Sequence, residues 1–200
     1  MSKSNSKQLY SISEIYKIVY YGLRTMKYMS FEKRKGNINS EFVERLMLAV
    51  TEVNKCAMCS YAHSKMALEM GMNSEEIKDM LNGEFSAVPN DELQAVMFAQ
   101  HYADNRGNPT KESWDQIVSV YGQDKALGIL GAIRAIMMGN AYGIAWGSFF
   151  NRFKRNPDPR SNIIYELLVM IVGTLFIPLA IIHALLANLL KFKIINFNKN

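Results

Sequence analysis

An all-α fold is the class that the sequence predicts, and three observations predict it. Apolar residues recur at three- and four-residue steps along most of the chain, which is the period of an amphipathic helix. Capping residues and glycines stand where these apolar stripes begin and end. No segment alternates apolar and polar residues at a two-residue period for long enough to form a strand.

The first 35 residues are expected to form a basic amphipathic helix. Its apolar stripe consists of Leu9, Ile12, Tyr16, Val19, Leu23 and Met26. Packing against the rest of the fold is the favoured use of this stripe, and contact with a membrane surface is the alternative. Lys17, Arg24 and Lys27 interrupt the segment, so it lacks the apolar run of a signal peptide, and the folded part is expected to be cytoplasmic.

Residues 36–153 are expected to form the main helical domain. Ser40 can cap a helix over 40–53, after which Asn54 and Lys55 break the pattern. A second helix is expected from Cys56 to a stop at Gly71. Further helices are expected from the capping box at Ser74, over 92–102, over 110–121 with Thr110 as its cap and Gly122 at its end, and over 124–150.

Residues 154–162 are expected to form a polar linker, and residues 163–200 a membrane-anchor segment. No charged residue occurs from Leu167 to Leu190, and a helix of that length spans about 36 Å against a hydrocarbon core of about 30 Å. A transmembrane helix over 163–190 is the favoured interpretation, and an interfacial segment or a buried oligomerisation helix are the alternatives. His183 and Asn188 inside it are expected to be packing residues rather than a proton or quinone site.

Composition and charge exclude several classes of protein. Apolar residues make up 49% of the chain and charged residues 20%, which is typical of a folded protein. Acidic residues outnumber basic ones in 36–150, whereas both ends of the chain are basic. This arrangement argues against a nucleic-acid groove across the fold and suits ends that contact anionic lipid.

Both cysteines stand in one motif, Cys-x-x-Cys-x-x-x-His, which consists of Cys56, Cys59 and His63. On a helix these side chains fall on one face, within about 60° of arc. Such a pair can form and release a disulfide. His63 is one turn beyond Cys59 and can take its proton, which favours Cys59 as the nucleophile, whereas the N-terminus of the helix favours Cys56. The order of the two cysteines stays open.

Glu44 stands twelve residues before Cys56, so on one unbroken helix it would be about 18 Å away along the axis. A reversal of the chain at Asn54 and Lys55 would let Glu44 approach His63 or Cys59, as a proton acceptor or as the group that orients the imidazole. From the residues alone, a solvated glutamate is the simpler interpretation.

The run Glu44–Lys55, followed by the Cys-x-x-Cys-x-x-x-His motif, resembles the alkylhydroperoxidase AhpD-like group of the carboxymuconolactone decarboxylase superfamily. The similarity continues through 71–77 and, more loosely, to about Phe153. Met58 departs from the pattern, because some relatives have a histidine between the cysteines. The resemblance implies an AhpD-like helical bundle that assembles as a homo-oligomer.

The activity that the resemblance implies is that of a thiol-dependent peroxidase or disulfide reductase, an antioxidant enzyme with Cys56, Cys59, His63 and Glu44 as its catalytic residues. It would bind no cofactor and no metal. Its partners would be a peroxide or disulfide substrate and an external dithiol reductant, either a lipoyl group or a peroxiredoxin-type protein. The decarboxylases of the superfamily lack the cysteine pair, so decarboxylation is disfavoured.

Two alternatives compete with the redox hypothesis. A zinc site could use both cysteines and His63, with His101 as a fourth ligand. A membrane-associated scaffold could keep the fold without turnover, with the cysteines as small buried apolar residues.

Overall fold

The structure is a computed structural model that describes residues 8–197. These residues form helices and no strand, which confirms the all-α class. In chain order the elements are α1 (Ile12–Arg34), α2 (Ser40–Asn54), α3 (Ala57–Glu69), α4 (Ser74–Leu81), α5 (Asn90–Asp104), α6 (Lys111–Phe153), α7 (Ile163–Leu168), a π-helical turn (Val169–Gly173) and α8 (Thr174–Leu189). Residues 1–7 and 198–200, the outer ends of the two predicted terminal segments, lie outside the described residues.

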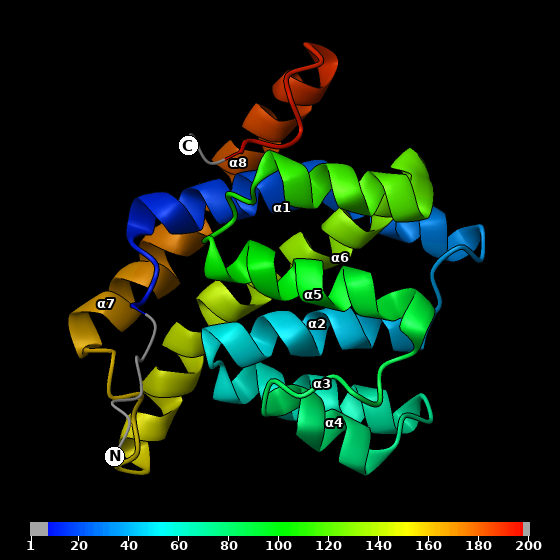
Figure 1. The fold of residues 1–200 in the computed structure, drawn as a ribbon. Coiled ribbons are helices and arrows are strands. Elements are labelled where there is room, and N and C mark those ends of the chain that lie inside the picture. The colour runs from blue at the N-terminus through cyan, green and yellow to red at the C-terminus, as the bar shows by residue number, and fades with distance from the viewer. Residues whose placement is uncertain (1–7, 198–200) are drawn as a thin grey trace.

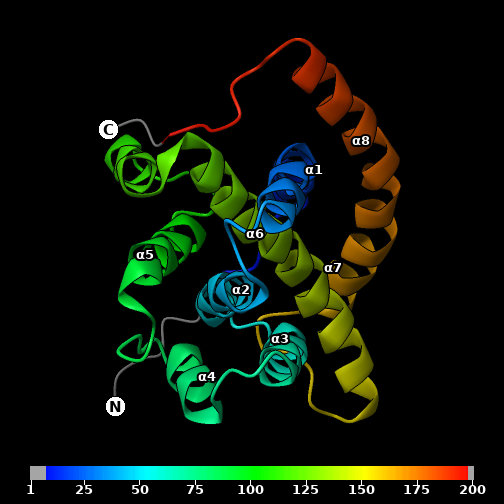
Figure 2. The ribbon, with the colours of Figure 1, turned by 90° about the vertical axis from the view of Figure 1, so that its right-hand side faces the viewer.

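The long helix α6 is the axis of the fold (Figure 1). Helix α1 packs along it, α2 and α5 cover another side, and α3 and α4 pack onto α2. Figure 2 shows α7 and α8 as one arc along the outside of α1 and α6. The core contains fully buried side chains from α1, α2 and α6, among them Ile15, Val19, Leu46, Leu48, Ile129 and Ile133. The N-terminal helix is therefore a core element, as its apolar stripe favoured.

The predicted breaks between helices are present, with two local corrections. Asn73 caps α4 in place of the expected Ser74, because its side-chain oxygen accepts a hydrogen bond from the Glu75 amide at 2.7 Å. Asn39 caps α2 in place of the expected Ser40, because its side-chain oxygen accepts a hydrogen bond from the Phe42 amide at 2.7 Å. Thr110 caps α6 as predicted, through a 3.2 Å bond from the Ser113 amide. Gly122 breaks the helical backbone inside α6, where its φ is 74°.

The apolar segment after residue 162 packs against α1 and α6. Small buried residues form its inner side: Gly173, Ala180, Ala184 and Ala187. The polar residues inside it have partners in the domain. The Nδ1 atom of His183 lies 3.0 Å from the Tyr16 hydroxyl, and Asn188 Oδ1 accepts a 3.0 Å bond from Arg24 Nε. Both residues are thus packing residues, as expected.

The outer side of the same segment is apolar and exposed. Its exposed large side chains include Ile164, Ile171, Leu175, Leu179, Ile182, Leu185, Leu186 and Leu189. Within residues 8–197, two helices could cross a membrane by length and composition, Lys111–Phe153 and Ile163–Leu189. The first is mostly buried in the core and the second is mostly exposed, so the second has the more extensive apolar surface.

The connection 154–162 is held against the domain. Arg160 donates from Nη1 to the Asn54 carbonyl at 3.1 Å and from Nη2 to the Lys55 carbonyl at 3.0 Å. Arg152 and Ser148 of α6 both bond the Glu166 carboxylate of α7. These contacts fix the end of α2 and the start of α7 relative to α6.

Candidate functional site

The cysteine pair lies at a sharp turn between α2 and α3. Lys55 ends α2 in the left-handed conformation, with φ 54° and ψ 47°, and the chain then enters α3. Cys56 is the N-cap of α3, and its sulfur accepts a 3.3 Å hydrogen bond from the Cys59 amide. The two residues form a disulfide, with Cα atoms 5.2 Å apart. The structure therefore pairs Cys56 with Cys59, as the motif predicted.

The same turn brings Glu44 to His63. Because the chain reverses after residue 54, α2 and α3 pack against each other, and Glu44 Oε2 lies 2.8 Å from His63 Nδ1. Glu44 is buried, and the side chain of His63 is 14% exposed. This contact fixes the imidazole and leaves Nε2 as the nitrogen that can exchange a proton with another group. The interpretation of Glu44 as a solvated surface residue is wrong, because the turn removes the distance along one helix.

The neighbour of Glu44 is engaged elsewhere. Arg45 is buried and pairs with Glu76 of α4 at 2.6 Å and with Glu92 of α5 at 3.0 Å. These ion pairs hold α2 between α4 and α5 and keep the arginine directed away from the imidazole. The Glu44 carboxylate therefore bonds His63 and not the neighbouring arginine.

Helix α6 covers the sulfur atoms with a glycine. A Cβ atom at Gly143 would lie 2.6 Å from Cys59 Sγ and 2.9 Å from Cys56 Sγ, closer than real contacts of that kind. The Gly139 carbonyl, one turn earlier, lies 3.7 Å from Cys59 Sγ. Cys56 is fully buried and Cys59 is 7% exposed. Of the two residues, Cys59 is therefore the less completely buried.

An open pocket of about 220 Å³ adjoins the start of α3. Ala57 and Met58 form one wall, and Gly143, Gly147 and the loop 156–159 form the others. Met58 is 44% exposed and Tyr61 is 76% exposed on the same helix. The pocket therefore opens the Met58 side of α3 to solvent, next to the turn that carries the pair.

Three features of the site were not predicted in their roles. Gly143 and Gly139 lie inside the helix expected over 124–150, and no role at the site was predicted for them. Arg160 belongs to the segment expected to be a polar linker, yet it bonds the two carbonyls that precede Cys56. Contacts across about a hundred residues of chain leave no local pattern, so no signal in the sequence could have identified these roles.

The remaining candidate ligand for zinc is not part of the site. His101 lies near the end of α5, and its Nε2 accepts a 3.2 Å bond from the Thr110 amide. Within residues 8–197, no group of three or more His, Cys, Asp or Glu side chains is arranged to hold a metal ion.

Comparison with known proteins agrees with this geometry. The model of the carboxymuconolactone decarboxylase family matches residues 21–100, a range that includes Glu44, both cysteines and His63. The match confirms the superfamily that the motif predicted. No curated protein and no solved structure gives a significant match to the chain.

Proposed function

We propose that residues 21–100, which match the carboxymuconolactone decarboxylase family, carry a dithiol redox centre that reduces peroxides or disulfides. The observation that supports this most is the 2.8 Å contact between Glu44 and His63, one turn of α3 beyond Cys59. A buried carboxylate that orients an imidazole beside a cysteine pair is an arrangement for moving a proton to and from a thiol.

Cys59 is the attacking residue in this proposal, because it is the more exposed of the two and lies one turn from His63. The Cys59 thiol gives its proton to His63, and the thiolate attacks a peroxide oxygen. The O–O bond breaks, an S–O bond forms, and the leaving alkoxide takes the proton as an alcohol. The Cys56 thiol then attacks the sulfenic sulfur, the S–S bond closes and water leaves.

An external dithiol completes the cycle. The enzyme loses two electrons to the peroxide, and the dithiol restores them by thiol-disulfide exchange. A lipoyl-type dithiol or a peroxiredoxin-type protein is the class of donor we propose, and we propose that the chain works as a cytoplasmic homo-oligomer. A disulfide substrate would enter by the same exchange at Cys59.

Turnover of hydrogen peroxide with dihydrolipoamide as the reductant tests the proposal. Cys59→Ser and Cys56→Ser should both lose turnover, and His63→Gln should lower it by roughly 10²-fold or more, which is the usual worth of a general base. Ser64→Ala, at the next position of α3, is the matched control and should turn over like the wild type. A wild-type chain that forms no Cys56–Cys59 disulfide with peroxide would favour the scaffold hypothesis instead.

We further propose that the C-terminal segment attaches the protein to a membrane by lying on its surface. Both ends of the segment are fastened to one domain, through Glu166 to Arg152 and through Asn188 to Arg24. A spanning helix in this position would draw the charged residues of α1 into hydrocarbon, which costs several kcal/mol for each. The exposed apolar side of α7 and α8 suits an interfacial helix.

Basic and aromatic residues stand where such an arrangement needs them. Lys154 and Arg155 are exposed before the segment, and Lys191 and Lys193 after it. These cations can bind anionic headgroups on a single side of a bilayer. Trp146, Phe149, Phe150 and Phe153 follow Tyr142 on one face of α6, and the Tyr142 hydroxyl bonds the Gly173 carbonyl of the segment. Aromatic rings of this kind favour the interface between lipid and water.

Labelling of introduced cysteines distinguishes the two topologies. In a full-length chain with Cys56→Ser and Cys59→Ser, one cysteine is placed at Asn156 or at Lys193, and sealed vesicles that contain anionic lipid carry the protein with its domain outward. A maleimide that does not cross membranes should label both positions without detergent. Labelling of the Lys193 position only after detergent would show a spanning helix. Failure to bind the vesicles would remove the membrane proposal without touching the redox proposal.

A further inference from the structure

A second cavity, of about 140 Å³, lies on the side of α6 away from the disulfide. It is formed by α1, α6 and the loop after α5. Arg134 lines it from α6, nine residues before Gly143. Nine residues turn a helix by about 180° and advance it by about 14 Å, so the cavity and the two sulfurs lie on opposite faces of α6.

Arg134 is a buried cation that has no counter-charge among the described residues. It is 2% exposed, its Nε donates to the Tyr102 hydroxyl at 2.7 Å, and its guanidinium lies 4.8 Å from the centre of the Tyr21 ring. No carboxylate among residues 8–197 pairs with it, and its Nη1 has no hydrogen-bond acceptor there. Burial of an unpaired charged donor costs several kcal/mol, so a group that completes it is expected.

Arg24 shows how this fold completes a buried arginine. It is 1% exposed, and its donors reach Asn188, the Tyr20 hydroxyl and the carbonyls of Phe192 and Lys193, at 2.7 to 3.2 Å. Arg134 is different, because it faces a cavity, whereas Arg24 is surrounded by four acceptors from the protein. The unsatisfied donor of Arg134 is therefore a property of its site and not of every buried arginine in this chain.

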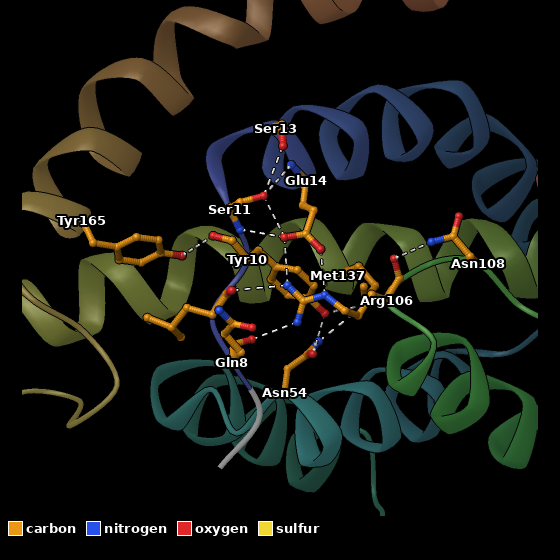
Figure 3. A network of polar contacts seen from close by, with 11 residues as sticks. Gln8, Tyr10, Ser11, Ser13, Glu14, Asn54, Arg106, Asn108, Met137 and Tyr165 are labelled. Atoms are coloured by element: carbon orange, nitrogen blue, oxygen red, sulfur yellow. Dashed lines mark hydrogen bonds and ion pairs between the residues drawn. The ribbon is translucent and has the colours of Figure 1, made fainter. Parts of the chain in front are cut away.

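The other charges around the cavity leave it positive. Glu14 lines it, but Arg106 holds both of its carboxylate oxygens, at 2.7 and 2.9 Å, as Figure 3 shows. Lys17 adds a further positive charge at the wall. The amide of Asn108 and the hydroxyls of the two tyrosines can also bond a ligand.

We propose that this cavity binds a small oxyanion, a carboxylate or a phosphate group, with Arg134 as the residue that recognises it. Guanidinium groups bind both kinds of anion through charge-assisted hydrogen bonds. The volume admits a group of that size and no nucleotide. Since the site lies across α6 from the sulfurs, the ligand is an effector or a stabilising ion and not the peroxide substrate. This inference stands apart from the redox proposal.

Unfolding of the full-length protein in a neutral detergent tests the site, with sodium phosphate and sodium acetate compared with sodium chloride at equal ionic strength. We expect a saturable rise in the unfolding temperature with phosphate or acetate but not with chloride, and the more effective anion identifies the class. Arg134→Met should weaken the binding measured by calorimetry by at least about tenfold, which is the worth of a hydrogen bond to a charged group.

The second readout is the order of stability of the wild type and Arg134→Met, which should reverse when the anion is added. Without oxyanions Arg134→Met should be at least as stable as the wild type, because an apolar side chain replaces an uncompensated charge. With the effective anion the wild type should become the more stable. Arg24→Met is the matched control, and it should lose stability while it keeps the anion response. If neither anion stabilises the wild type, or if Arg134→Met responds equally, the proposal is wrong. If the wild type shows no anion response and Arg134→Met loses an oligomer that the wild type forms, the counter-charge comes from a second copy of the chain and the proposal is also wrong.

Discussion

Two sulfur atoms packed under a glycine define the site at the scale of the residue. Gly143→Ala would place a methyl group 2.6 Å from Cys59 Sγ, so α6 or the sulfurs must move. We expect a loss of about 1–3 kcal/mol in unfolding free energy and a lower rate of peroxide turnover. Gly147→Ala is the matched control, since its methyl group would meet Met58 Cβ at an ordinary 3.4 Å. Equal behaviour of the two variants in denaturant titrations and turnover assays would contradict this packing.

The identity of the site residues could be predicted from the sequence, but their contacts could not. The spacing of Cys56, Cys59 and His63 places them on one helical face, whatever surrounds them. The partnership of Glu44 with His63 depended on a turn at residue 55, which the sequence only permitted. The carbonyl contacts of Arg160 and the glycine over the sulfurs depend on chain segments that meet only in the folded state.

At the scale of the element, the pairing of α1 with α6 supports the whole fold. Gly131→Ala would place a methyl group 2.7 Å from the Thr25 carbonyl of α1. A backbone carbonyl cannot move aside as easily as the end of a side chain, so the unfolding free energy should fall by about 1–3 kcal/mol. Gly139→Ala on the same helix meets only a side-chain methyl at 3.6 Å and should raise it by about 0.5–1 kcal/mol. Thermal unfolding of both variants checks the opposite signs.

The start of α1 is tied to the loop after α5 by an ion pair that depends on pH. A hydrogen bond from Arg106 is the main reason that the pKa of Glu14 falls from 4.5 to about 2. A lowered carboxyl pKa gives stability that is full above about pH 4.5 and is lost as the pH falls from there towards 2. The unfolding free energy of Glu14→Gln should therefore fall less than that of the wild type between pH 6 and 3. We expect a difference of about 1 kcal/mol, because the side chains are 28% and 34% exposed. Parallel curves for the two proteins would contradict this role.

Helix boundaries were predictable because local chemistry sets them. Thr110 and Gly122 act through their own side chain and backbone freedom, and both act as expected. Asn39 and Ser40 are adjacent residues that can both cap a helix, and only the accepted bond from Phe42 decides between them. A pattern of residue types cannot predict which of two adjacent capping residues forms the hydrogen bond.

At the scale of the whole molecule, an apolar helix and the domain that carries the cysteine pair form one body. Hydropathy identified residues 163–190 as apolar and long, but not which side of the helix the domain covers. That side depends on Tyr16 and Arg24, which stand more than 160 positions away from their partners His183 and Asn188. Because the segment is fastened along α1, a chain shortened before residue 163 would expose the buried guanidinium of Arg24 and should not serve as a model of the isolated domain.

The central claim is that Cys56 and Cys59 exchange electrons with a peroxide while His63, held by Glu44, handles the proton. Its most direct test is a single turnover: the reduced full-length protein receives one equivalent of hydrogen peroxide, and mass spectrometry follows the two thiols in time. We predict that the Cys56–Cys59 disulfide forms in the wild type, and that it forms more slowly in His63→Gln and in Glu44→Gln at neutral pH. Thiols that stay reduced, or a disulfide that forms at the same rate in all three proteins, would contradict the account.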